Sequence, residues 1–265
     1  MAHEIHDKLT VEGIKPLLDK NGARFNLRVV DSVGSTNDEL KRLALNGARE
    51  GMVLVASYQT AGRGRFGRSF VSPDSGVYLS MLLRPSLLPG QAVRLTTAAA
   101  VAVCRALEFC GADSPQIKWV NDVYLHGKKV CGILTESGTD PRTGALGYAV
   151  VGVGINVYEP EGGFDPELRG KAGAVFPERC DNLRNFVTAE FLNSFAQLYA
   201  TVGTNAHAAE YRSRCFVIGR KVTVQRGGTE RRATVLDVDR ECRLLVRYDD
   251  GQEEILSSGE ISLKI

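Results

Sequence analysis

Residues 59–68 read Gln59-Thr60-Ala61-Gly62-Arg63-Gly64-Arg65-Phe66-Gly67-Arg68 and follow the apolar run Met52–Ala56. The apolar run has the composition of a buried strand. Residues 62–68 contain three glycines and three arginines, which cannot build a core element. Glycine leaves backbone amides bare, and arginine adds planar forks that match phosphate and carboxylate oxygens. We therefore predict an anion-binding loop at the end of a strand.

Two other interpretations of this loop are weaker. A solvated basic turn would not need three glycines. The glycines also spell G-x-G-x-x-G, the dinucleotide fingerprint, which requires a helix at the third glycine and an acid about 20 residues later. Here a turn-rich piece, residues 69–76, leads into another strand, Val77–Leu83, which ends at Arg84-Pro85. The context excludes the dinucleotide fold.

Composition limits the class of protein. The chain has 265 residues, 43% of them hydrophobic and 24% charged, which suits one large domain or one domain plus a small module. The net charge of +2 gives no overall basic field for nucleic acid. The six scattered cysteines form no C-x-x-C pair and are typical of reduced thiols. With no signal peptide and no apolar run of membrane-spanning length, we expect a cytoplasmic protein that binds neither membrane nor nucleic acid, and no metal cage of Cys and His.

A polar helix start precedes the loop. Ser35-Thr36-Asn37 comes just before Leu40, Leu43 and Ala44, which recur at helical spacing. Ser35 or Thr36 is expected to cap this helix. Capping alone explains both residues, yet a helix N-terminus is also where polar groups can meet a ligand.

A second informative block is Ile117–Leu125. It is expected to form one strand, whose alternation sends its polar side chains to opposite faces. Lys129–Glu136 and Leu146–Val157 follow as two further strands after short turns, which predicts an antiparallel meander. Gly152 and Gly154 in the last strand mark close approach of backbone or ligand. The block contains Lys118, the sole tryptophan Trp119, Asn121 and Asp122.

The chain changes character near its end. Residues 158–187 are loop-rich and have no assigned structure, and a helix around Phe191–Leu198 follows them. From Val217 onward, short alternating strands predict a small SH3-like β-barrel. We therefore expect two domains, residues 1–216 and 217–265. The turns that separate the short strands are expected at Gly227-Gly228, Asp239-Arg240, Asp249-Asp250-Gly251 and Ser258-Gly259.

From about Asp31 to its C-terminus the chain resembles the biotin protein ligases. The resemblance rests on four motifs, each weak alone and specific in this order. They are Ser35-Thr36-Asn37; Gly62-Arg63-Gly64-Arg65-x-Gly67-Arg68; Lys118-Trp119-x-Asn121-Asp122; and Lys129-x-x-Gly132-Ile133-Leu134 with Gly154-Ile155-Asn156 behind it.

The resemblance implies an α+β (mixed α/β) catalytic domain, with a mixed, largely antiparallel sheet packed by helices, followed by the SH3-like barrel. It implies ATP-dependent attachment of biotin to a lysine of the biotin carboxyl carrier protein domain of a biotin-dependent carboxylase, through biotinyl-5′-AMP. ATP and Mg²⁺ are the expected cofactors, with Mg²⁺ carried by ATP and no metal site on the protein. A homodimer is compatible with the resemblance.

The motifs also imply roles for individual residues. Lys129, Arg65 and Asp122 are the expected catalytic groups. The expected biotin contacts are Ser35, Thr36, Asn37, Gln59, Arg63, Gly64, Arg65, Lys129, Gly132 and Leu134. The expected nucleotide contacts are Arg63, Arg65, Trp119, Asn121, Lys129 and Asn156.

The chain departs from the family pattern at three places. Val120 stands where proline is usual and Phe66 where another arginine is common, and neither position must supply a charge. The 34 residues before Ser35 are too few for the winged helix-turn-helix of bifunctional relatives, so we expect the ligase-only form.

Three rival functions remain open. Lipoate or octanoate ligases of related fold typically carry three consecutive glycines and a downstream histidine, which this chain lacks. A biotin-binding regulator without catalysis would not need both Lys129 and Asp122. In the third alternative, the barrel is a peptide-binding module and the remainder a scaffold.

Overall fold

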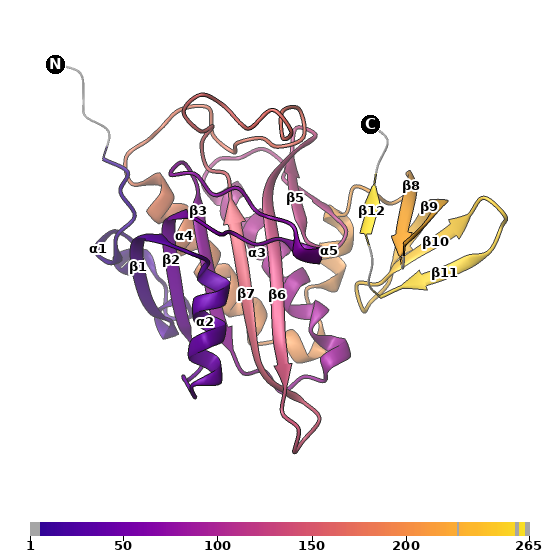
Figure 1. Ribbon diagram of the computed structural model, residues 1–265, viewed down its shortest axis with the longest axis horizontal. Coiled ribbons are helices and arrows are strands. Elements are labelled where there is room, and N and C mark those ends of the chain that lie inside the picture. The colour runs from indigo at the N-terminus through magenta and orange to yellow at the C-terminus, as the bar shows by residue number, and fades with distance from the viewer. Residues whose placement is uncertain (1–5, 227, 258–259, 263–265) are drawn as a thin grey trace.

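The larger of two β-sheets organises the molecule (Figure 1). The computed structural model describes residues 6–226, 228–257 and 260–262. Strand order is β1-β2-β3-β7-β6-β5-β4, and only β1 and β2 run parallel. The predicted mixed, largely antiparallel sheet is thus confirmed. The strands are β1 (Asn26–Val33), β2 (Met52–Gln59), β3 (Val77–Leu83), β4 (Gln116–Lys118), β5 (Asp122–Leu125), β6 (Lys128–Thr139) and β7 (Leu146–Ile155).

Helices cover both faces of this sheet (Figure 1). On one face, Leu40 of α2 packs with Leu54, Leu82 and Val150. On the other face lie α3, whose small alanine side chains allow close approach to the strands, and α4. The helices are α1 (Val11–Ile14), α2 (Thr36–Leu45), α3 (Val93–Phe109), α4 (Leu183–Tyr199) and α5 (Ala208–Arg214). Short 3₁₀ turns are η1 (Lys15–Leu17), η2 (Gly22–Arg24), η3 (Arg65–Gly67), η4 (Pro89–Gln91) and η5 (Val202–Thr204). No described helix is both long enough and apolar enough to cross a bilayer.

The expected single strand at 117–125 is wrong. The chain reverses at residues 119–121, with a cis peptide bond between Trp119 and Val120, and β4 pairs antiparallel with β5. Lys118 therefore lies directly opposite Asp122, and residues expected on two faces come to one place. The remaining meander is confirmed, because β5, β6 and β7 pair in sequence order.

The second sheet is C-terminal and antiparallel throughout. Its strands are β8 (Lys221–Arg226), β9 (Thr229–Val238), β10 (Leu244–Tyr248), β11 (Glu253–Leu256) and β12 (Glu260–Ser262), in the order β11-β10-β9-β8-β12. It lies beside α5, at the end of the molecule away from α1 (Figure 1). The predicted turns at 239–240 and 249–251 are confirmed, whereas Gly227, Ser258 and Gly259 of the other two lie outside the described residues.

Candidate active site

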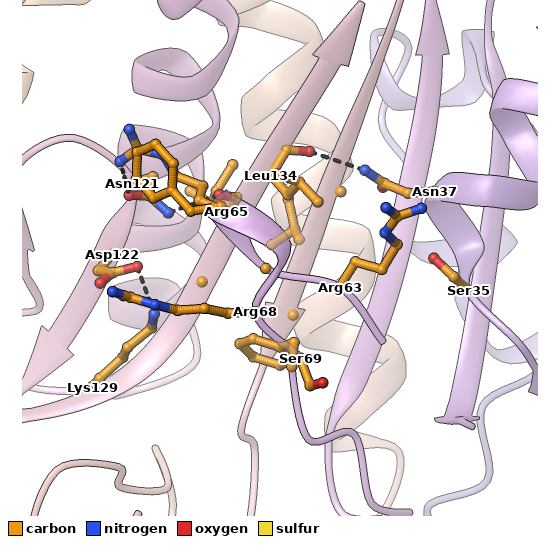
Figure 2. Close-up of a pocket in the computed structure, with 18 of the residues that line it drawn as sticks. Ser35, Asn37, Arg63, Arg65, Arg68, Ser69, Asn121, Asp122, Lys129 and Leu134 are labelled. Carbon is orange, nitrogen blue, oxygen red and sulfur yellow. Dashed lines mark hydrogen bonds and ion pairs between the residues drawn. The ribbon is translucent and has the colours of Figure 1, made fainter. Parts of the chain in front are cut away.

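One cavity collects nearly all the candidate residues (Figure 2). It lies between the loop after β2, the start of α2, the β4–β5 turn and the middle of β6 and β7. Ile261 of β12 also lines it, so the C-terminal sheet reaches the cavity. The candidates that line the cavity are Ser35, Thr36, Asn37, Gln59, Arg63, Gly64, Arg65, Trp119, Asn121, Asp122, Lys129, Gly132 and Leu134.

Gln59 ties the start of α2 to the far end of the loop. It is the last residue of β2, so the expected loop begins one residue later. Its Oε1 accepts from the Thr36 amide at 2.9 Å and lies 3.1 Å from Thr36 Oγ1. Its Nε2 donates to Ser72 Oγ at 3.0 Å. Ser35 caps α2 as predicted, with its hydroxyl accepting from the Asp38 amide. The start of α2 therefore carries several polar groups on rigid backbone.

The Asn37 side chain is held entirely by protein groups. Its Nδ2 donates to Leu134 O at 3.2 Å (Figure 2), and it also donates to Glu136 Oε2 at 3.0 Å. Its Oδ1 accepts from the fully buried Ser80 hydroxyl at 2.6 Å. Burial raises the pKa of Glu136, but hydrogen bonds from Lys41 and Asn37 outweigh it, and the net pKa is lowered. Ser80 could not be singled out from the sequence, because its role depends on the packing of α2 against β3.

The Asn37 side chain packs directly against the backbone of Gly152, which has no side chain of its own. An added Cβ would lie 2.1 Å from Asn37 Oδ1. We expect Gly152→Ala to displace that amide, to deform this end of the cavity and to weaken ligand binding by about 1–3 kcal/mol, as overpacking does. Calorimetric titration with biotin, the ligand that the sequence motifs imply, measures the loss. Gly34→Ala is the control, since its Cβ would meet nothing within 4 Å. Equal affinities for both variants would contradict this account.

The loop between β2 and β3 is folded over the cavity by its arginines. Arg63 pairs with Asp38 of α2, Nη1 to Oδ1 at 2.7 Å. Arg65 Nη1 donates to Asn121 Oδ1 at 3.0 Å, and Asn121 in turn donates to Ile133 O of β6 at 2.9 Å. The loop thus bridges from α2 to the β4–β5 turn, over the strand β6 that holds Lys129 and Gly132.

Phe70 supplies an apolar wall that the sequence did not single out. Gly132 and Gly154 face each other across β6 and β7. A Cβ on either glycine would come within 2.9 or 2.5 Å of the Phe70 ring. The predicted close approach is therefore made by side chains, with Asn37 against Gly152 and Phe70 against Gly154.

Lys129 and Asp122 form the charged centre of the cavity. Lys129 Nζ lies 2.7 Å from Asp122 Oδ1, and both side chains are partly shielded from solvent. Arg68 reaches from the loop toward this pair (Figure 2). A lysine in a half-closed site beside arginine side chains can neutralise two anions brought together there.

Asn156 is the candidate that does not line the cavity. It follows β7, where its Nδ2 donates to Gly173 O at 3.1 Å and its carbonyl accepts from the Val175 amide at 2.9 Å. Gly173 also donates to Lys129 O at 2.9 Å. The segment 171–175, which the sequence left unassigned, therefore joins Asn156 to the strand that carries Lys129.

Comparisons with known proteins agree on one family. Residues 29–156 match the Biotin/lipoate A/B protein ligase family, and residues 217–264 match the Biotin protein ligase C terminal domain. The chain is 33% identical over 269 residues to the biotin--[acetyl-CoA-carboxylase] ligase of Mycobacterium tuberculosis, covering 94% of this chain and 96% of that protein. It is 38% identical over 146 residues to the bifunctional ligase/repressor BirA of Bacillus spizizenii, a match that spans 55% of this chain and only 44% of that protein.

A solved structure also resembles the whole fold. The biotin protein ligase from Aquifex aeolicus in complex with biotin and ATP superposes with a TM-score of 0.74 at 27% identity. The superposition covers 89% of this chain and 97% of that one.

Proposed function

The chain belongs to the biotin protein ligases, and from this premise we propose that it attaches biotin, at the expense of ATP, to a lysine of a biotin carboxyl carrier domain. Biotinyl-5′-AMP is the intermediate. The observation that carries the proposal is the meeting of the arginine-rich loop, the polar start of α2 and the Lys129–Asp122 pair in one cavity. The Mycobacterium relative is named for the same reaction, and the Aquifex structure holds biotin and ATP.

In the first step a biotin carboxylate oxygen attacks the α-phosphorus of ATP, and the bond to pyrophosphate breaks. Two anions must approach against their repulsion, so fixed cations aimed at the transferring group lower the barrier. We assign this role to Lys129 and Arg65, which both line the cavity. Mg²⁺ enters as part of the ATP substrate. Within residues 6–226, 228–257 and 260–262, no group of three His, Cys, Asp or Glu side chains could hold a metal ion.

In the second step the ε-amine of the carrier lysine attacks the acyl carbon and AMP departs. Asp122 lies at the cavity beside Lys129, where a carboxylate can hold the incoming amine. The mixed anhydride is destroyed by water, so a loop that folds over the cavity protects it. The bridge from Arg63 to Asp38 and from Arg65 to Asn121 supports that role for the loop.

The remaining polar groups suit a bicyclic urea, which offers N–H donors and one carbonyl acceptor. Thr36, Gln59 and the Ser35 hydroxyl are the proposed partners, with Gly132 and Leu134 against the acyl chain. Asn37, whose amide is already engaged by protein, fixes the shape of this end. Asn156 and Trp119 remain the proposed nucleotide contacts. Asn156 is connected to Lys129 through Gly173, which hydrogen-bonds to both residues.

Two further assignments concern the domain boundary and the cellular location. We place the domain boundary between Phe216 and Val217, because α5 ends at Arg214 and the second family match begins at residue 217. We also propose a cytoplasmic location, where ATP is available and thiols stay reduced. The six cysteines are free in the structure, which is compatible with such a location.

The experiment that tests this function is ATP–pyrophosphate exchange with biotin, lipoate and octanoate offered in turn. We expect exchange with biotin alone, followed by biotinylation of a purified carrier domain detected as a mass increase. Because the first family match includes lipoate ligases, the acid must be varied and not only the nucleotide. Exchange driven by lipoate or octanoate, or none with biotin, would overturn the proposal.

A further inference from the structure

Trp119 connects the cavity to the C-terminal sheet. Its side chain lines the cavity and is only 3% exposed. Its indole Nε1 donates to the carbonyl oxygen of Cys242 at 2.9 Å. Cys242 belongs to the turn between β9 and β10, here called the β9–β10 turn and defined as Asp239–Arg243. One side chain thus contacts both the proposed reaction site and the second sheet.

The direction of that carbonyl depends on the shape of the β9–β10 turn. Cys242 has φ +58°, a left-handed conformation that a side chain rarely adopts. The turn is held by Asp239 Oδ1, which accepts from the amides of Glu241 at 2.9 Å and Arg243 at 2.8 Å. If the turn rearranged, the hydrogen bond to Trp119 would be lost.

Two further contacts dock the β9–β10 turn on the first domain. Asn205 Nδ2 donates to Arg240 O at 2.6 Å. Arg94 Nη2 of α3 pairs with Glu241 Oε2 at 2.7 Å. Both contacts join the tip of the turn to α3 and the segment after η5, through residues that do not line the cavity. Docking strength can therefore be changed without altering a residue that lines the cavity.

The segment that starts at Trp119 carries two groups of the cavity. The next carbonyl, that of Val120, accepts from the buried Tyr211 hydroxyl at 3.0 Å. Asn121 then holds Arg65 of the loop, and Asp122 pairs with Lys129. Residues 119–122 are thus clamped by α5 on one side and by the β9–β10 turn on another, and they present their polar side chains to the cavity.

This docking contact is polar and incompletely satisfied. Among the described residues, four buried side-chain atoms have no hydrogen-bond partner, and three of them are Arg94 Nε, Asn205 Oδ1 and His207 Nδ1. A buried polar atom left without a partner destabilises the contact. His207 Nε2 lies 2.8 Å from Thr97 Oγ1, on the same face of α3 as Arg94. Departures of this kind concentrate at functional sites.

We infer that the β9–β10 turn is a positioning element. When it is docked, it fixes the Trp119 indole, and through residues 119–122 it holds Asn121 and Asp122 in the arrangement that adenylation needs. Asn205 and Glu241 act through Trp119 and never touch substrate. The inference rests on the proposed function for its kinetic consequence, while its structural part can be measured without any activity.

Trp119 is the sole tryptophan of the chain, so its fluorescence reports directly on docking. The variant Asn205→Gly/Glu241→Ala removes both docking contacts, and glycine accepts the φ of +54° at position 205. We expect its emission to shift to longer wavelength as water reaches the indole. The kcat of biotin-dependent pyrophosphate exchange should fall about three- to tenfold, which is the effect expected from the loss of one hydrogen bond. The matched control is Glu253→Ala, which removes the exposed ion pair with Arg247 in the same sheet.

A double-mutant cycle separates coupling from general damage. Trp119→Phe should lower kcat by a similar factor, and adding it to Asn205→Gly/Glu241→Ala should lower kcat no further. Multiplying effects, an unshifted emission, or a shifted emission with wild-type kcat would each overturn the inference. If the double variant does not fold, Glu241→Ala alone provides the same comparison. If the wild type itself shows no exchange, the proposed function fails, and the emission alone decides whether the turn holds Trp119.

Discussion

Lys129→Ala should reduce biotin-dependent pyrophosphate exchange by about 10²–10³-fold, the effect of removing one preorganised donor worth about 2.7–4 kcal/mol from a closed site. The Lys129 Nζ is the cation of the ion pair at the centre of the cavity, 2.7 Å from Asp122. Once substrates enter, the same charge can turn to the carboxylate and the α-phosphate. The rate of biotin transfer from chemically supplied biotinyl-5′-AMP should fall less than the rate of exchange, because only the first step brings two anions together.

The neighbouring Lys128→Ala is the control for this prediction. It changes the same charge one residue away, on a side chain that is exposed and does not line the cavity. Because Lys129→Ala removes the ammonium that pairs with the partly shielded Asp122 carboxylate, Lys129→Ala/Asp122→Asn should recover thermal stability but not exchange. Wild-type exchange in Lys129→Ala would show that the lysine has no part in adenylation. Restored exchange in the double variant would assign the loss to misfolding.

The sequence predicted the parts of the site that lie close together along the chain. The glycine–arginine loop followed from composition, and the α2 cap at Ser35 followed from residue type and the helical spacing after it. Gly152 and Gly154 correctly indicated close approach within a strand. Each of these signals is local, because turn chemistry, capping and strand alternation act over a few residues.

The features that the sequence missed depend on contacts between distant segments. The reversal at 119–121 contains neither glycine nor proline, and Asn121 is a weaker turn signal, so one strand was predicted instead of β4 and β5. Ser80 looks like any polar residue in a strand until α2 packs above it. Likewise, the hydrogen bond from Trp119 to the carbonyl oxygen of Cys242 joins residues that are 123 positions apart in the sequence. Such pairings are set by packing, which periodicity within one segment does not encode.

Arg65 is expected to matter more for retaining the biotinyl-5′-AMP intermediate than for forming it. Its guanidinium holds the loop to Asn121, while Lys129 stands independently on β6. Removing Arg65 should therefore slow adenylation less than removing Lys129. The intermediate should instead leave before a carrier lysine arrives, because the loop closes less often over the cavity. The escape is measured as free biotinyl-5′-AMP, or as biotinylation of a bystander protein, above the wild-type level.

Comparing Arg65→Ala with Arg65→Gly separates the effect of losing the guanidinium from the effect of added backbone freedom. Both variants lose the charged fork, but glycine also adds backbone freedom that makes closure less favourable by up to about 1 kcal/mol. Escape should therefore rise from wild type to Arg65→Ala and again, by as much as about fivefold, to Arg65→Gly. Arg142→Gly in the exposed β6–β7 turn is the control for added flexibility. If neither variant forms the adenylate, Arg65 is as necessary for the first step as Lys129, and retention of the intermediate is not its separate role. If both retain it like the wild type, the loop does not act as a lid.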